Sequence, residues 1–280
     1  MSLHDSIRPR ARMAGPEAIR SRSNPLVRRL RALKQRGAEA DLCLLEGLSL
    51  VEEALSAGIT LEEVAVSPRL AATAAGRRLA ARLRGTAAAF REVDEHVLAQ
   101  VSELETSPGV LALARRPSFE EDALYAGTPL IAVAMGIQNP GNLGGLLRTA
   151  EAAGATGLYV TDGTADPLSW KSLRGSMGSA LRVPHVRGRP REVLRRLSER
   201  GVRTIATTAA SGAVAYDQTD LRGAVAFLFG PEGAGLPRDL LDEADLQVRI
   251  PMRPPVESLN VGVAAGILLY EAARQRGFSR

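Results

Sequence analysis

The stretch FLFGPEGAGL, residues 227–236, joins an apolar run to a glycine-rich loop and points to an α/β fold. An apolar run without polar alternation is typical of a strand that is buried on both faces of a parallel sheet. Three glycines directly after such a strand let the backbone approach a ligand closely. Their spacing, G-x-x-G-x-G, differs from the G-x-G-x-x-G of dinucleotide-binding proteins, so a nicotinamide or flavin enzyme fits poorly.

Similar apolar runs on both sides of this stretch predict the remaining strands. In the second half of the chain they cover residues 130–135, 157–160, 202–206, 224–229 and 246–250. Helical patterns separate most of these runs, which favours a mainly parallel sheet covered on both faces. In the first half, shorter runs cover residues 42–45, 64–66, 88–93 and 110–113 and alternate with helical patterns. They predict a second, smaller α/β unit.

Composition divides the chain into four parts. The prediction is a flexible basic lead-in at residues 1–23, a small domain at 24–114, a linker at 115–128 and a larger α/β domain at 129–280. The linker segment, RRPSFEEDALYAGT, is rich in charge and contains proline and glycine. The small domain begins with leucines at helical spacing, Leu26, Leu30 and Leu33.

Charge is concentrated at the front of the chain. Residues 1–40 hold ten basic side chains against three acidic ones, and the whole chain carries a formal net charge of +5. Such a cluster is typical of proteins that bind a phosphate backbone. Charge alone leaves a second interpretation open, in which an arginine-rich composition gives a merely solvated tail.

Membrane and secretory signals are not evident. No apolar run reaches the roughly 18 residues of a transmembrane helix, and the N-terminus lacks the apolar core of a signal peptide. Cys43 is the only cysteine, so it forms no internal disulfide, and the three histidines are scattered. We therefore expect a cytoplasmic protein that uses no metal ion.

The segment IQNPGNLGGLLRTA, residues 137–150, follows a predicted strand and opens a helix. Asn142 is well placed to cap that helix. The apolar positions at helical spacing, Leu143, Leu146, Leu147 and Ala150, are expected to face the core. Arg148 lies off this stripe, so packing does not explain it. An alternative is an exposed ion pair with Glu151.

A third polar segment, IPMRPPVESLN at residues 250–260, precedes the small-residue helix VGVAAGILLY at 261–270. Ser258 and Asn260 are each ordinary helix-capping residues. The glycines and alanines of the helix predict very close packing against another element or a second subunit. Glu232, flanked by glycines beside a strand end, is either a simple loop carboxylate or a contact residue.

Together these three segments resemble, in order and spacing, the sequence motifs of the SpoU family of RNA ribose 2′-O-methyltransferases. The matching patterns are N-P-G-N-L-G-x-x-x-R-T-A, F-G-P-E-G-x-G-L and I-P-M-x-x-x-V-E-S-L-N-V. The stretch KSLRGSMGS, residues 171–179, resembles the family's intermediate segment. Residues 24–67, with Leu45-Glu46-Gly47, resemble the L30e-like substrate-binding domain of many members. Pro254 and Gly262 depart from the commonest family residues, which are glycine and serine.

The resemblance implies a fold and a cofactor. Family members have a C-terminal deep trefoil knot and form homodimers through the knotted domain, and they bind S-adenosylmethionine as methyl donor without a metal. The positions that match the family's cofactor contacts are Thr207, Thr208, Gly230, Gly235, Ile250 and Leu259. An apolar slot with main-chain hydrogen bonds suits an adenine ring.

The resemblance also implies site roles. The expected catalytic residues are Asn142, Arg148, Glu232, Ser258 and Asn260. In the family, the position that matches Arg148 is proposed as the base that removes the 2′-hydroxyl proton. Because an arginine rarely gives up its proton, the alternative is that Arg148 clamps a phosphate or stabilises the 2′-oxyanion, with the other four residues orienting Arg148 and the ribose. The expected RNA contacts in the small domain are Arg28, Arg29, Arg31, Lys34 and Glu46.

The function predicted from the sequence is therefore S-adenosylmethionine-dependent 2′-O-ribose methylation of structured RNA, with ribosomal RNA favoured. The partners expected are that RNA and a second copy of the chain, with neither DNA nor a membrane. The alternatives are a transfer-RNA methyltransferase, a non-catalytic RNA-binding or ribosome-assembly protein on the same fold, and another small-molecule or nucleotide enzyme on a similar sheet.

Overall fold

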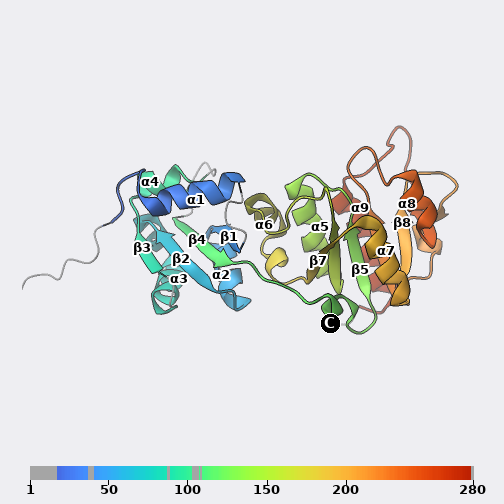
Figure 1. Ribbon diagram of the computed structural model, residues 1–280, viewed down its shortest axis with the longest axis horizontal. Coiled ribbons are helices and arrows are strands. Elements are labelled where there is room, and N and C mark those ends of the chain that lie inside the picture. The colour runs from blue at the N-terminus through green and yellow to red at the C-terminus, as the bar shows by residue number, and fades with distance from the viewer. Residues whose placement is uncertain (1–17, 37–40, 87–88, 103–106, 108, 279–280) are drawn as a thin grey trace, which may run out of the picture.

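The computed structural model of the 280-residue chain describes residues 18–36, 41–86, 89–102, 107 and 109–278. Two separate β-sheets, each covered by helices, stand side by side along the long axis of the molecule (Figure 1). Residues 1–17 of the predicted lead-in, and Ala88 of the predicted strand 88–93, lie outside the described residues. No helix in the described part of the chain is long and apolar enough to cross a membrane.

The smaller unit contains a four-stranded sheet in the order β1-β4-β2-β3. Its strands are β1 (Leu42–Glu46), β2 (Leu61–Val66), β3 (Ala89–Glu92) and β4 (Val110–Arg115). Its helices are α1 (Pro25–Arg36), α2 (Leu48–Ser56), α3 (Ala74–Gly85) and α4 (Glu95–Ala99). Strand β4 pairs antiparallel with β1 and β2, and β2 pairs parallel with β3.

Strand β1 is buried on both faces of the small sheet, which explains its continuous apolar run. Cys43 and Leu45 of β1 pack in one core cluster with residues of α2 and α3. Leu42 and Leu44, which point to the opposite face, pack in another cluster with residues of α1 and α4.

The larger unit contains a seven-stranded sheet in the order β7-β6-β5-β10-β8-β11-β9, and every described pairing in it is parallel. Its strands are β5 (Leu130–Ala134), β6 (Gly157–Thr161), β7 (His185–Gly188), β8 (Arg203–Thr207), β9 (Val214–Ala215), β10 (Val225–Phe229) and β11 (Leu246–Arg249). Its helices are α5 (Pro140–Ala152), α6 (Trp170–Ser176), α7 (Pro190–Glu199), α8 (Arg238–Glu243) and α9 (Val261–Gln275).

Helices cover both faces of the large sheet, as the continuous apolar runs predict. Leu130, Ala132 and Ala134 of β5 belong to the core cluster that contains residues of α5 and α9. Ile131 and Val133 belong to the cluster that contains residues of α7 and α8. The predicted mixed α/β fold with a mainly parallel sheet is therefore confirmed.

Two strands were not predicted. Strand β7, with the sequence HVRG, lies at the sheet edge and is only partly buried, and β9 has two residues. The segment predicted as a linker is partly ordered by packing. It contains the short 3₁₀ helix η2 (Glu121–Tyr125), in which Leu124 is fully buried.

Two glycines of α9 face α5 at ordinary van der Waals distances. A Cβ on Gly262 would lie 3.8 Å from the backbone of Gly145, and one on Gly266 would lie 3.6 Å from Thr149. Of the two predicted explanations for these small residues, packing against another element of the same chain is therefore present. This packing brings the start of α9 beside the start of α5.

Candidate functional site

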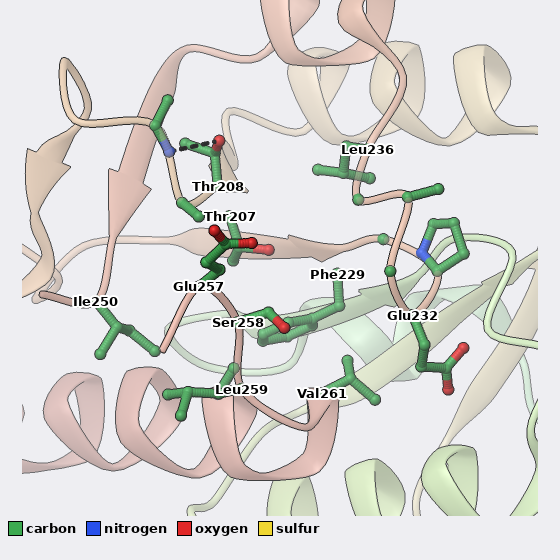
Figure 2. Close-up of a pocket in the computed structure, with 18 of the residues that line it drawn as sticks. Thr207, Thr208, Phe229, Glu232, Leu236, Ile250, Glu257, Ser258, Leu259 and Val261 are labelled. Carbon is green, nitrogen blue, oxygen red and sulfur yellow. Dashed lines mark hydrogen bonds between the residues drawn. The ribbon is translucent and has the colours of Figure 1, made fainter. Parts of the chain in front are cut away.

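A pocket of about 620 Å³ lies where three neighbouring parallel strands end. Thr207 and Thr208 at the end of β8, Gly230 after β10 and Ile250 after β11 line it (Figure 2). The carboxyl ends of parallel strands are where open α/β sheets bind ligands. The volume is within the range of small-molecule sites.

The loop after β10 gives the pocket a wall of backbone. A Cβ on Gly230 would lie 2.6 Å from the backbone of both Gly235 and Leu236, so no larger residue fits there. Gly233 and Gly235 have φ angles of +82° and +67°, which L side chains rarely adopt. The glycine spacing noted in the sequence thus serves a compact turn that leaves main-chain groups beside the pocket.

The opposite wall is formed by the ends of β8 and β11. The Thr207 hydroxyl donates to the carbonyl of Leu228 at 2.8 Å, and the Thr208 hydroxyl accepts from the backbone N–H of Ala210 at 3.2 Å. These bonds fix the first residues after β8. Phe229 is 1% exposed and contributes an apolar floor (Figure 2).

Asn139, and not Asn142, caps helix α5. The Asn139 side-chain oxygen accepts from the backbone N–H of Gly141 at 2.8 Å and of Asn142 at 3.2 Å. Pro140 is the first helical residue, a position that proline favours. The predicted cap was wrong by three residues because the helix begins at the proline, and the side chain of Asn142 is left available for other partners.

One residue from each of the three motifs joins a hydrogen-bonded chain at the pocket mouth. The Asn142 amide donates to Oε1 of Glu232 at 2.7 Å, and the Asn260 amide donates to Oδ1 of Asn142 at 3.0 Å. Asn260 also caps α9, because its Oδ1 accepts from the backbone N–H of Gly262 at 2.9 Å. Figure 2 shows the Glu232 side chain turned away from Thr207 and Thr208.

Arg148 lies on the exposed side of α5 and is not among the residues that line the pocket. The alternative of an Arg148–Glu151 ion pair is wrong. Both Glu151 oxygens accept from Arg182, at 2.7 and 2.9 Å. The guanidinium of Arg182 lowers the pKa of Glu151 below its usual value of 4.5. Arg148 has no ion-pair partner among the described residues.

The structure gathers most of the residues that the sequence singled out. All six predicted cofactor residues line the pocket, and so do Glu232, Ser258 and Asn260. Asn142 joins them through its hydrogen bonds, and Arg148 stands apart. Sequence reasoning missed Leu236 and Phe229 as apolar walls, although both belong to the quoted stretch 227–236. The roles assigned to the site residues stay predictions.

The residues predicted to bind RNA occupy different environments. Arg28 is exposed on α1, Arg29 lies 3.4 Å from Glu63, and Arg31 donates to Gln100 at 3.3 Å. Lys34 donates to the carbonyl of Val101.

Glu46 is the most enclosed of this predicted set, at 5% exposed. One of its oxygens accepts from Nε1 of Trp170 at 2.7 Å, and the other accepts from the Ser102 hydroxyl. Its carboxylate is thus engaged within the protein. Across the described ranges, no group of three or more His, Cys, Asp or Glu side chains could hold a metal ion. Metal-free chemistry stays a prediction.

Fold and site together define an α/β protein with a pocket of small-molecule size at the carboxyl end of a parallel sheet. Residues 129–270 match the SpoU rRNA Methylase family, and residues 24–112 match the MRM3-like substrate binding domain. The chain is 34% identical to the 23S rRNA (guanosine(2553)-2′-O)-methyltransferase RlmP of Bacillus subtilis, over 85% of this chain and 90% of that protein.

Solved structures agree with these matches. The AdoMet-bound rRNA methyltransferase of Sinorhizobium meliloti has a TM-score of 0.79 at 32% identity, over 92% of this chain and 97% of that one. The SpoU methyltransferase AviRb of Streptomyces viridochromogenes, in complex with AdoMet, has a TM-score of 0.81 at 28% identity, over 92% and 100%. The chain belongs to the SpoU rRNA methylase family.

Proposed function

We propose that this chain is an S-adenosylmethionine-dependent RNA 2′-O-ribose methyltransferase that acts on ribosomal RNA. The observation that carries the proposal is the Glu232–Asn142–Asn260 chain, which ties three family motifs together at the mouth of the pocket. The RlmP relative, named for 23S rRNA, and the AdoMet-bound structural neighbours support the RNA class and the cofactor.

The pocket suits S-adenosylmethionine in size and in wall chemistry. The pocket has a volume of about 620 Å³. Its walls are the apolar side chains of Phe229, Ile250 and Leu259 and the backbone of Gly230 to Gly235. An apolar slot with a few main-chain partners is what a purine ring requires. When bound, this cofactor supplies an electrophilic methyl group. Thr207, Thr208, Gly230, Gly235, Ile250 and Leu259 would hold it.

The motif residues then act on the RNA. An arginine keeps its proton at neutral pH, since its pKa is above about 12. We propose that Arg148 is a fixed positive charge that clamps a phosphate beside the target ribose or stabilises the 2′-oxyanion. Asn142, Glu232, Ser258 and Asn260 orient the ribose and Arg148. Holding the 2′-oxygen in line with the methyl group is the main contribution, because alignment accounts for much of the barrier reduction.

The small unit supplies RNA affinity in this proposal. Its match to a substrate-binding domain supports RNA as the partner. Arg28, Arg29, Arg31 and Lys34 are its proposed contacts, and phosphate contacts make such binding depend on salt. Glu46, which was also predicted to contact RNA, is buried, and its two carboxylate oxygens accept hydrogen bonds from Trp170 and Ser102. The likeness of this unit to L30e, the cytoplasmic location and the boundaries at 24–114, 115–128 and 129–280 stay predictions.

A homodimer through the larger unit is also part of the proposal. Val263 and Tyr270 lie two turns apart on the same side of α9 and are 52% and 42% exposed. Val256, in the preceding loop, is 52% exposed. Exposed apolar side chains on neighbouring elements are typical of a contact surface. The deep trefoil knot stays a prediction that rests on the family resemblance.

The proposal is tested by methyl transfer from labelled S-adenosylmethionine to an unmodified 23S rRNA transcript, followed by alkaline hydrolysis. A 2′-O-methyl group protects one phosphodiester bond from alkali, so the expected product is a labelled dinucleotide. The variant Arg148→Ala should lower turnover by roughly 10²–10³-fold and leave cofactor affinity unchanged. Arg189→Ala, an exposed arginine of the same unit, is the matched control.

Other outcomes select the alternatives. If the methyl label appeared on transfer RNA and not on the 23S transcript, transfer RNA would be the substrate in place of ribosomal RNA. Cofactor and RNA binding without transfer to either RNA would favour a non-catalytic RNA-binding protein. Loss of cofactor affinity in Arg148→Ala would show that Arg148 contributes to cofactor binding and not only to contacts with the RNA.

A further inference from the structure

A second cavity, of about 660 Å³, lies between the two units. The turn from β1 into α2, at Gly47 and Ser49, lines one side. Helix α6 lines the other with Trp170, Lys171, Arg174 and Met177. Figure 1 shows α6 between the two sheets, next to the small unit. This cavity is separate from the pocket at the strand ends, and the two share no lining residue.

Trp170 fixes the geometry of this cavity. It belongs to the larger unit by sequence, yet it is 6% exposed and packs in a core cluster of the small unit. Its Nε1 donates to the buried Glu46 at 2.7 Å. The guanidinium of Arg174 lies 4.8 Å from the Trp170 ring centre, and the ammonium of Lys34 lies 4.4 Å from it. Stacking on the ring holds these cations beside the cavity.

The side chains that line this cavity carry a net positive charge. Lys171 and Arg174 are exposed on α6, one turn apart, and within the described residues neither has an ion-pair partner. Glu46 is the acidic residue of the lining, and both of its oxygens already accept hydrogen bonds from protein groups. The first turn of α2 also lines the cavity, and a helix N-terminus favours a nearby anion.

Residue usage points to the same place. The chain contains 36 basic side chains, of which only Lys34 and Lys171 are lysines, and Trp170 is its single tryptophan. Trp170 and Lys171 line this cavity, and the Lys34 ammonium lies over the Trp170 ring. A lysine ammonium is a compact point charge that commonly binds phosphate. Lys171 therefore places a compact positive charge on the cavity wall.

One residue of the cavity lining packs against the start of α5. A Cβ on Gly175, which lines the cavity, would lie 3.1 Å from the carbonyl oxygen of Gly141. Gly141 is in the first turn of α5, the helix that also carries Asn142 and Arg148. A nucleic-acid strand that occupies the cavity therefore lies beside the helix that presents Arg148.

We infer that this interdomain cavity binds a backbone phosphate of the RNA substrate, with Lys171 and Arg174 as its cationic ligands. The inference rests on the proposed function, because it assigns part of the RNA path to a site outside the cofactor pocket. It also gives α6 a role in substrate binding that is separate from its packing against α5.

The test compares RNA binding by the full chain and by the variant Lys171→Gln/Arg174→Gln, with an unmodified 23S rRNA transcript as probe. The double variant should bind at least roughly tenfold more weakly. The slope of log Kd against log salt concentration should fall by about 1 for each phosphate that the variant no longer neutralises. Arg78→Gln/Arg82→Gln, on exposed positions of α3, removes the same charge elsewhere and is the matched control.

Two further readouts separate a binding role from a structural one. Trp170 fluorescence, excited at the red edge of its absorption, should change on RNA binding in the wild type and not in the double variant. Arg174→Lys should retain most of the affinity, because it keeps the positive charge. Cofactor affinity should be unchanged in every variant.

Failure of the inference differs from failure of the proposed function. If the double variant binds RNA with the affinity and salt slope of the α3 control, the cavity is not a phosphate site, even though the wild type methylates RNA. If the wild type neither binds nor methylates RNA, the proposed function is overturned first, and the inference falls with it.

Discussion

The pocket at the carboxyl end of the large sheet and the cavity between the units have similar volumes, about 620 and 660 Å³, but different walls. The first is built within one unit, largely from strand ends, glycines and apolar side chains. The second needs both units, and cationic side chains dominate its charge. These walls suit a small, partly apolar ligand at the first and a phosphate of a polyanion at the second, which are the two assignments proposed above. A substitution in the wall of one cavity should therefore change the affinity for one ligand and not for the other.

The largest effect, on cofactor affinity, is expected from a substitution that displaces the glycine-rich loop of the first pocket. In Gly230→Ala, the new Cβ meets the backbone of Gly235 and Leu236 at 2.6 Å, so the loop has to shift. Overpacking typically costs about 1–3 kcal/mol, which corresponds to roughly 5- to 150-fold in S-adenosylmethionine affinity. Calorimetric titration measures this affinity, and RNA affinity should not change.

The control for this variant is Gly212→Ala, because an added Cβ there would meet no atom within 4 Å. Its cofactor affinity should equal that of the wild type. Equal affinity in Gly230→Ala itself would mean that the backbone wall after β10 does not hold the cofactor, and the contrast between the two cavities would disappear.

An intermediate effect is expected at the joint that shapes the second cavity. Trp170→Phe removes the N–H that donates to Glu46 and leaves a buried carboxylate oxygen without that donor. The expected loss in the free energy of unfolding is about 1–3 kcal/mol. Circular dichroism during urea unfolding measures it without the tryptophan signal.

A double-mutant cycle of Trp170→Phe with Glu46→Ala isolates the contact. The coupling energy between the two substitutions should be about 0.5–3 kcal/mol, as for residues in direct contact. Strictly additive effects would show that the Trp170–Glu46 hydrogen bond does not join the units. In that case another contact would have to define the cavity.

The smallest effect concerns pH. Arg182 donates to Glu151 on α5 and to Glu53 on α2, so it links the two units. The pKa of Glu151 in the folded protein lies below its usual 4.5. The unfolded state then binds more protons as pH falls from 4.5, so the stabilisation from this group is present above pH 4.5 and is lost as pH falls through the folded pKa.

Thermal unfolding of the wild type and Glu151→Gln checks this sign. The wild type should melt higher at neutral pH, and the difference should shrink toward zero well below pH 4.5. Glu199→Gln, which removes a carboxylate exposed on α7, should show a smaller difference at neutral pH. A difference for Glu151→Gln that grows on acidification would contradict the direction of the pKa shift.

The residues of the first pocket were predicted from the family resemblance, and the parallel strands explain why these positions meet. Thr207, Gly230 and Ile250 are each at or next to a strand end, and parallel strands bring their carboxyl ends to one edge. The bond from Asn142 to Glu232 spans 90 residues, and only the family motifs hinted that the two positions meet.

The second cavity could not be predicted in this way. It depends on the contact between Trp170 and Glu46, which are 124 residues apart and belong to different predicted domains. The sequence pattern around Trp170 does not say which core receives its side chain. Strand β7 was missed for a related reason: its HVRG sequence is short and half polar, and the pairing with β6 provides the stabilisation.

The most direct test of this division is one steady-state methyl-transfer experiment on Lys171→Gln/Arg174→Gln, with RNA and S-adenosylmethionine varied in turn. Two separate ligand sites predict a raised KM for the 23S rRNA transcript, an unchanged KM for S-adenosylmethionine and an RNA effect that weakens as salt is added. A raised KM for S-adenosylmethionine, or an unchanged KM for RNA, would contradict the assignment of the two ligands to two separate cavities.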